Sequence, residues 1–280
     1  MNYKELLVDA SKQLKFYKFN SATLDTELIL SKTLGISREK ILLNLNEKIN
    51  DEVLEKFNYF LKLRKQNRPI AYILGFKDFW KYKFQVDKNV LIPRPETELI
   101  IEQALKNLPK LSNKNILDIG TGSGCIIISI IKERENCKAT AIDKSLKALK
   151  VAKLNAEMHH VQKKIKFLNI DVDKYFANKY DLIVSNPPYI KKSKLRSLIE
   201  DIKNFEPKLA LDGGPDGFSV IWKVIAKSSK LLKKNGMLIL EIDNTQVIKT
   251  KEMLKKYKFY TKDVCRDLSG NYRCVTAIKL

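Results

Sequence analysis

The chain has 280 residues, of which 44% are hydrophobic, so it can bury the core of one large domain together with a smaller one. Its formal net charge of +21 suggests nucleic-acid binding, but the lysines are spread along the whole chain, so we interpret most of them as solvated surface. We expect a metal-free cytoplasmic protein that contacts no membrane: no signal peptide opens the chain, no apolar run could span a bilayer, and the four cysteines and two histidines lack metal-ligand spacing.

Residues 1–74 are predicted to form a small helical domain, because their apolar residues recur at helical spacing. Three stripes mark its helices: Leu6, Leu7, Ala10 and Leu14; Leu24, Leu28 and Leu34; and Val53, Leu54, Phe57, Phe60 and Leu61. A bundle ahead of a catalytic part can recognise a folded partner at a distance, so we expect a substrate-recognition domain.

Residues 75–90 contain alternating aromatic and polar residues, which predict a hairpin-like linker. Residues 91–280 then alternate strand and helix patterns, typical of an α/β domain with a sheet of about seven strands. We expect strands near 115–118, 138–142, 165–170, 180–185 and 237–242, followed by two late strands at 259–264 and 273–277.

A glycine-rich turn follows the first of these strands and predicts a nucleotide-type ligand site. Asp118 precedes the turn, which runs through Gly120, Thr121, Gly122, Ser123 and Gly124 into an apolar helix. Asp143 ends the next strand, about 20 residues further on, where an acid can bind ribose hydroxyls. Asp143 is equally suited to cap the following helix, and only its spacing from the turn favours the ribose.

S-adenosylmethionine fits this turn better than its rival, a dinucleotide such as NAD. The glycines read Gly-x-Gly-x-Gly, which is not the spacing that places a pyrophosphate on a helix N-terminus. Asp118 would also repel a pyrophosphate, whereas it could attract the ammonium of a methionine group.

The fourth strand ends in Asn186-Pro187-Pro188-Tyr189, a stiff turn rich in hydrogen-bond acceptors. The Asn186 side-chain oxygen and the Pro187 carbonyl could each accept one proton of an incoming NH2 group and so turn its lone pair toward an electrophile. Tyr189 could pack flat on the substrate. These features predict methyl transfer to a conjugated nitrogen by positioning and electrostatics, without a strong base.

The sequence as a whole resembles the release factor glutamine methyltransferases of the HemK/PrmC family. The resemblance rests on Arg68 to Gly75, Phe79-Trp80, Leu91-Ile92-Pro93-Arg94-Pro95-Glu96-Thr97-Glu98, Asp118 to Gly124, Asn186 to Tyr189, Phe205-Glu206-Pro207 and Cys265-Arg266-Asp267. It implies a Rossmann-like class I methyltransferase domain at 91–280, with a seven-stranded mixed sheet whose last strand is inserted antiparallel.

The resemblance also implies the reaction and the remaining site residues. A monomer would methylate the glutamine of the Gly-Gly-Gln motif in class 1 release factors and leave S-adenosylhomocysteine. Asp171 and Val172 would contact adenine, although the family has an aromatic residue where this chain has Val172. Relatives also carry a glycine near Asp243. Arg94, held between two prolines, would belong to a fixed loop over the substrate rather than to a surface pair with Glu96.

Three alternatives stay open at this stage. The Asn-Pro-Pro-Tyr turn would serve the exocyclic amine of adenine in RNA or DNA as well as an amide, although we regard nucleic acid as the less suitable substrate. A ribosomal-protein glutamine is a second alternative acceptor. The third alternative is a basic nucleic-acid-binding module without activity, against which the intact glycine turn, Asp143 and Asn186 argue.

Overall fold

The computed structural model describes residues 1–177 and 179–280. The chain forms two units, one of Met1–Phe76 with Ile199–Phe205 and one of Lys77–Leu198 with Glu206–Leu280. Ile199–Phe205 thus joins the first unit although it lies far along the sequence, in the range expected for the α/β domain. Within the described ranges, no helix is both long and apolar enough to cross a membrane.

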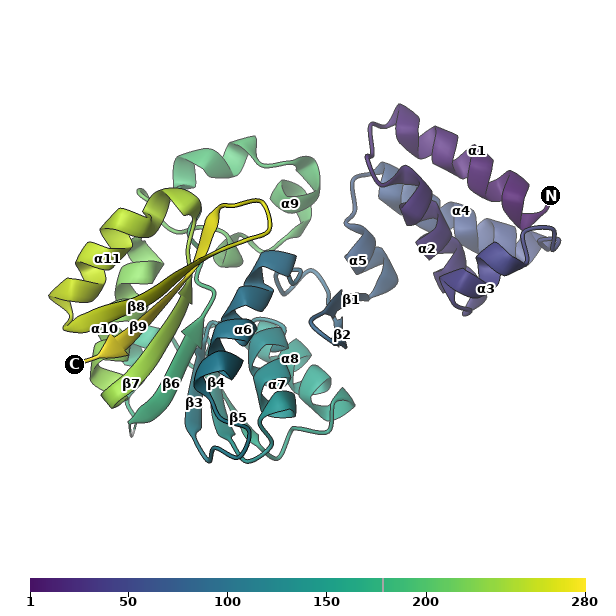
Figure 1. Cartoon of the computed structure of the whole chain (residues 1–280). Helices are drawn as coiled ribbons and strands as arrows, with labels where there is room; N and C mark the ends of the chain where they lie inside the picture. Colours follow the sequence, from purple (N-terminus) through teal and green to yellow (C-terminus); the bar gives the residue numbers. More distant parts are fainter. Residues whose placement is uncertain (178) are drawn as a thin grey trace. The chain divides into compact units, whose positions relative to one another are not determined.

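The first unit is a bundle of short helices with its own apolar core (Figure 1). Asn2 caps the first helix through a capping box with Glu5, and Asn50 caps the fourth by accepting from the Val53 amide. The helices are α1 (Tyr3–Phe16), α2 (Ala22–Leu34), α3 (Arg38–Leu43), α4 (Asp51–Lys65), α5 (Ile70–Leu74) and α9 (Glu200–Phe205).

The apolar stripe predicted for α2 was wrong at Leu24, whereas Leu34 packs against the core as expected. Leu24 is 44% exposed, whereas Ile29 and Leu30 are buried. The helix also turns Asp25 inward, where its Oδ2 accepts a hydrogen bond of 2.7 Å from Nε of the buried Arg64. Because a polar residue occupies the buried face, apolar spacing alone gave the wrong orientation.

The second unit is built on a seven-stranded sheet, in the order β5-β4-β3-β6-β7-β9-β8. Its first five strands are parallel, and β9 lies antiparallel between β7 and β8, which confirms the expected mixed sheet. The strands are β3 (Asn115–Ile119), β4 (Lys138–Asp143), β5 (Ile165–Asn169), β6 (Tyr180–Ser185), β7 (Leu232–Glu241), β8 (Phe259–Arg266) and β9 (Tyr272–Lys279).

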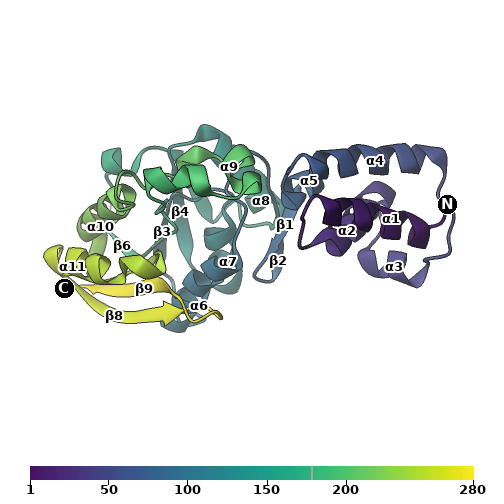
Figure 2. The same ribbon diagram turned by 90° about the horizontal axis from the view of Figure 1, so that it is seen from above.

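Helices cover both faces of this sheet (Figures 1 and 2). Ile116 of β3 packs in the core beneath α6, α7 and α8, and its neighbour Leu117 packs in the core beneath α10 and α11. Successive residues of a strand face opposite sides, so a sheet with two covered faces needs uninterrupted apolar strands. The helices are α6 (Glu98–Asn107), α7 (Cys125–Glu133), α8 (Leu146–Met158), α10 (Ser219–Leu231) and α11 (Val247–Lys256).

The expected hairpin consists of β1 (Phe76–Phe79) and β2 (Tyr82–Gln85), and α5 directly precedes it. Asn155 of α8 fixes β2 by accepting from the Gln85 amide at 2.7 Å and donating to the Gln85 carbonyl at 3.0 Å. The same amide nitrogen donates to the Ser123 carbonyl at 2.8 Å. One buried side chain therefore joins the hairpin to the glycine-rich turn.

The strand order reverses beside β3, because β4 pairs on one side of it and β6 on the other. At such a switch point the loops that follow the strands diverge and leave a crevice at their carboxyl ends. The loops after β3 and β6 are the ones that carry the two motifs found in the sequence.

Candidate active site

A cavity opens at this edge of the second unit. Residues that follow four strands line it, together with part of the loop before α6. The predicted residues among them are Arg94, Gly120, Thr121, Gly122, Ser123, Asp143, Asp171, Val172, Asn186 and Pro188. The sheet therefore brings together most of the residues singled out in the sequence.

The glycine-rich turn presents backbone to the cavity. Gly122 has a φ of +56°, which disfavours a residue with a side chain, and its amide donates to Asp143 Oδ2 at 3.0 Å. A Cβ at Gly120 or Gly122 would meet nothing within 4 Å, so this space is open to a ligand. Gly124 differs: it caps α7, and a Cβ there would lie 2.9 Å from Ile128 Cδ1. Close helix packing explains that third glycine.

Asp118 lies behind the turn, fully buried. Its Oδ2 accepts from the Thr121 hydroxyl at 2.7 Å, and its Oδ1 has no hydrogen-bond partner within the described ranges. Burial, with a smaller contribution from the charge of Asp143, raises the pKa of Asp118 to about 7. An unpartnered buried carboxylate oxygen suits a nearby cation, but Asp118 is not among the residues that line the cavity.

Asp143 lines the cavity and also bonds the start of α8, so the ribose role stays a prediction, while the cap of that helix is the nearby Ser145. Asp143 Oδ1 accepts from the Ser145 amide at 2.8 Å at the start of α8, while Oδ2 holds Gly122 and the carboxylate lines the cavity. Ser145 itself is the helix cap, since its hydroxyl accepts from the Ala148 amide. Burial raises the pKa of Asp143 above its ordinary value.

Aliphatic side chains form one wall of the cavity beyond Asp143. Ile142, Ile170 and Val172 line it, with Val220 from α10. Asp171 also lines the cavity, and its carboxylate accepts from the Asp173 amide, which caps a short 3-10 helix (Val172–Lys174). A planar ring would thus meet aliphatic surface here, because the sequence offers Val172 in place of an aromatic residue.

The Asn-Pro-Pro-Tyr turn follows β6 and contributes two residues to the cavity wall, Asn186 and Pro188. Asn186 Nδ2 donates to the Thr97 hydroxyl at 3.0 Å. Across the residues that the structure describes, nothing donates to Asn186 Oδ1 or to the Pro187 carbonyl. The two acceptors predicted to bind an NH2 group are therefore uncommitted.

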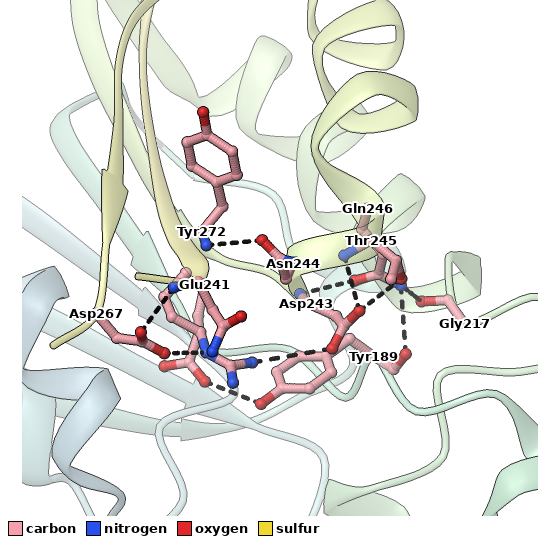
Figure 3. A network of polar contacts seen from close by, with 11 residues as sticks. Tyr189, Gly217, Glu241, Asp243, Asn244, Thr245, Gln246, Asp267 and Tyr272 are labelled. Carbon is pink, nitrogen blue, oxygen red and sulfur yellow. Dashed lines mark hydrogen bonds and ion pairs between the residues drawn. The ribbon is translucent and has the colours of Figure 1, made fainter. Parts of the chain in front are cut away.

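Tyr189 does not line the cavity. Its hydroxyl donates to Glu241 Oε1 at 3.2 Å (Figure 3). Burial, followed by the charge of Glu241, raises the pKa of Tyr189. Glu241 ends β7, is 2% exposed, and has its own pKa raised by burial to about 7.

Arg94 lines the cavity and forms an ion pair with the buried Glu206. The alternative pairing with Glu96 is therefore wrong. Glu206 Oε2 also accepts from the Ile92 amide at 3.3 Å, so one carboxylate holds the loop that carries Arg94. The prolines at 93 and 95 stiffen the same loop.

The segment after β7 supports the Asn-Pro-Pro-Tyr turn, and Asp243 has a structural role in that segment (Figure 3). Asp243 caps a 3-10 helix (Asn244–Gln246) through a capping box with Gln246. Gln246 Nε2 then donates to the carbonyls of Tyr189 and Gly217, at 3.3 and 3.0 Å. Arg273 lies between two acids and bonds Asp267 at 2.9 Å.

Sequence reasoning missed the residues that support the site from behind, namely Thr97, Glu206, Glu241 and Gln246. Thr97 and Glu206 stood inside blocks that carried the family resemblance, but nothing local assigned them a partner. Glu241 had one usable signal, since it is an acid at the end of an apolar strand.

Two family models match the chain. The methyltransferase small domain matches residues 97–205, and the PrmC N-terminal domain matches residues 5–75.

Full-length relatives carry one name repeatedly. The chain is 35% identical over 282 residues to the release factor glutamine methyltransferase of Clostridium botulinum, and the match covers 100% of both chains. It is 33% identical over 271 residues to the enzyme of that name from Caulobacter vibrioides, covering 96% of this chain and 94% of the relative. A "Bifunctional methyltransferase" of Rickettsia typhi is 36% identical over 293 residues; the match covers 97% of this chain but 56% of that protein, so the chain spans about half its length.

Solved structures share the fold at lower identity. A ribosomal protein L11 methylase from Lactobacillus delbrueckii subsp. bulgaricus superimposes with a TM-score of 0.52 and 18% identity, covering 68% of this chain and 82% of that one. A methyltransferase from Pyrococcus furiosus has a TM-score of 0.53 and 19% identity, covering 70% and 88%. These likenesses show a Rossmann-like methyltransferase fold.

Proposed function

The chain belongs to the family of release factor glutamine methyltransferases, and we propose that it methylates the glutamine of the Gly-Gly-Gln motif in class 1 release factors. The acceptor atom is the side-chain amide nitrogen. S-adenosylmethionine supplies an electrophilic methyl group and retains the electron pair of the broken carbon–sulfur bond as S-adenosylhomocysteine.

The cavity has the groups that such a cofactor needs. The open space beside Gly120 and Gly122 would admit the methionine portion, and the unpartnered Asp118 Oδ1 behind the turn would favour its ammonium. Asp143 would accept from the ribose hydroxyls, and the aliphatic wall that includes Val172 would hold adenine.

The acceptor site follows from the chemistry of an amide. Its nitrogen lone pair is delocalised into the carbonyl, so the nitrogen is a poor nucleophile. Asn186 Oδ1 and the Pro187 carbonyl would each accept one N–H and orient the nitrogen toward the methyl group. The nitrogen becomes cationic as its bond to carbon forms, so its proton is then acidic enough to leave without a strong base. These two uncommitted acceptors are the observation that carries the proposal.

The remaining assignments complete the proposal. Flanking glycines would let a backbone loop enter beside Pro188 and Arg94, where bulkier neighbours would not fit. The helical unit would bind the body of the release factor. We expect a monomer that acts in the cytoplasm, with nucleic acid not a substrate.

The test is to supply methyl-labelled cofactor with separate pools of release factor, ribosomes and nucleic acid. Label on the Gly-Gly-Gln glutamine, absent when that glutamine is replaced, would support the proposal. Label in a ribosomal protein or in adenine, with none in release factor, would overturn it in favour of one of the two alternative substrates.

A further inference from the structure

The Asn186 side chain carries an acceptor oxygen and a donor nitrogen. Only the orientation that directs the oxygen at the substrate can accept from an incoming NH2 group. With Oδ1 toward the cavity, the amide offers an acceptor; rotated by half a turn, it offers two donors that would repel the substrate's own N–H groups. Thr97 Oγ1 selects the first orientation, because it accepts from Asn186 Nδ2 at 3.0 Å. Thr97 is 2% exposed, so water has little access to take its place.

The Thr97 hydroxyl must keep its own proton pointed away from Asn186 for this to work. A hydroxyl has one proton and two lone pairs, so Thr97 can accept from Asn186 and donate elsewhere. Glu241 is the acceptor at hand, because its buried Oε2 has no hydrogen-bond partner among the described residues and the nearby Thr97 hydroxyl lowers the pKa of Glu241 against the larger, opposite effect of burial.

Among the described residues, Thr97 and Glu241 do not form a hydrogen bond of strict geometry. Glu241 Oε1 is occupied by the Tyr189 hydroxyl at 3.2 Å, and Oε2 has no partner within strict hydrogen-bond geometry in the described part of the chain. Hydrogen bonds of this kind can be long in a free enzyme and shorten when substrate is bound. Glu241 Oε2 can therefore accept a hydrogen bond from the Thr97 hydroxyl when substrate is bound.

We propose that Thr97 and Glu241 are positioning residues that together hold both ends of the Asn-Pro-Pro-Tyr turn, with the Asn186 oxygen directed at the accepting nitrogen. Glu241 lies at the end of β7, where its Oε1 accepts from the Tyr189 hydroxyl (Figure 3), and its unpartnered Oε2 would accept from Thr97. The inference rests on the proposed transfer to a planar NH2 group.

The experiment compares Thr97→Val with Thr97→Ser in the full-length protein. Valine keeps the shape of threonine and loses both hydrogen bonds, whereas serine keeps the hydroxyl. We expect Thr97→Val to lower kcat roughly tenfold or more, with KM for release factor and Kd for cofactor within about threefold of wild type. Thr97→Ser should retain kcat within about threefold. Equal kcat in Thr97→Val and wild type, or an equal loss in both variants, would overturn the inference.

A second measurement keeps this test separate from the identity of the substrate. If wild type labels adenine or a ribosomal protein instead, the proposed substrate fails, and the same two variants are compared on the acceptor that is labelled. The side-chain amide resonance of Asn186, assigned by its loss in Asn186→Ala, needs no turnover. It should shift in Thr97→Val and stay in place in Thr97→Ser; an unchanged resonance in Thr97→Val would refute the hydrogen bond.

Discussion

At the scale of single residues, Asn186 separates chemistry from cofactor binding. Asn186→Ala removes one of two acceptors for the substrate nitrogen while leaving the glycine-rich turn and Asp143 in place. We expect turnover to fall roughly a hundredfold, as when one preorganised hydrogen-bonding group is lost from an oxyanion hole. Calorimetry should find cofactor affinity nearly unchanged. Turnover close to wild type in the folded variant would contradict the mechanism.

Glu241 predicts a pH dependence of the methyl-transfer step. Its pKa is raised to about 7, so it is protonated below that pH and ionised above it. Only the ionised carboxylate could accept from both Tyr189 and, as proposed, Thr97. We therefore expect kcat at saturating cofactor to rise with pH through an apparent pKa near 7. Glu241→Gln cannot ionise, so its kcat should be lower and should not rise through this pH range. The same inflection in the pH profile of that variant would exclude Glu241 as its source.

We do not expect the other charged or titratable groups near Glu241 to produce this inflection in the pH profile of kcat. Arg273 lowers the pKa of Glu241 and Glu96 raises it. The buried thiols of Cys125 and Cys274 interact with its charge, but their own pKa values are raised, so they stay neutral across this range. Asp118 also titrates near 7, but its titration should change cofactor affinity and leave kcat at saturation unaltered.

The residues found from sequence and those missed differ in how far along the chain their partners lie. The glycines, Asp143 and Asn186 belong to short motifs whose chemistry is visible locally. Thr97 meets Asn186 across 89 positions, and Tyr189 meets Glu241 across 52. Such contacts depend on which strands become neighbours, which no short pattern specifies.

At the scale of secondary-structure elements, the strands were predictable because both faces of the sheet are buried. β3 and β6 read as largely apolar runs for that reason, whereas the edge strand β5 contains Lys166 and Asn169; the expected ranges of β3 to β6 agree closely with the structure. β7 was predicted from residue 237 but begins at Leu232, a residue that pairs with Tyr180 across an irregularity in the ladder. The polar stretch between Leu232 and residue 237 masked the strand pattern.

Alanine substitutions at two glycines with the same φ separate the free-energy cost of close packing at α7 from the cost of backbone strain. Gly124 and Gly270 both have a φ of +82°, but only at Gly124 would a Cβ meet Ile128 at 2.9 Å and Ala152 at 3.3 Å. Gly124→Ala should destabilise the protein by roughly 2–4 kcal/mol, since a strained backbone and overpacking add. Gly270→Ala should cost about 1 kcal/mol, from backbone strain alone. Equal losses in denaturant unfolding would show that close packing is not the reason for Gly124.

At the scale of the whole molecule, the first unit contains a piece of chain that comes from far along the sequence. Ile199–Phe205 belongs to it, although the chain on either side belongs to the second unit. This return lies between the Asn-Pro-Pro-Tyr turn and Glu206, both of which contribute to the candidate site. Composition could not reveal it, because the segment is short and mixes apolar with charged residues.

Arg64 provides the test of this arrangement, since it bonds Asp25 and Asp201, each at 2.7 Å. Arg64→Met would leave the buried carboxylate of Asp25 without its partner and should destabilise the first unit by roughly 3–5 kcal/mol. Asp201→Asn is the matched control, because the Asp201 side chain is 25% exposed and its loss should cost at most about 1 kcal/mol. Unfolding curves give both values.

If the helical unit binds the release factor, Arg64→Met should raise KM for that protein while calorimetry finds the Kd for S-adenosylmethionine unchanged, since the cavity residues all lie in the second unit. A parallel loss of cofactor affinity would instead mean that the second unit depends on the first for its own folding.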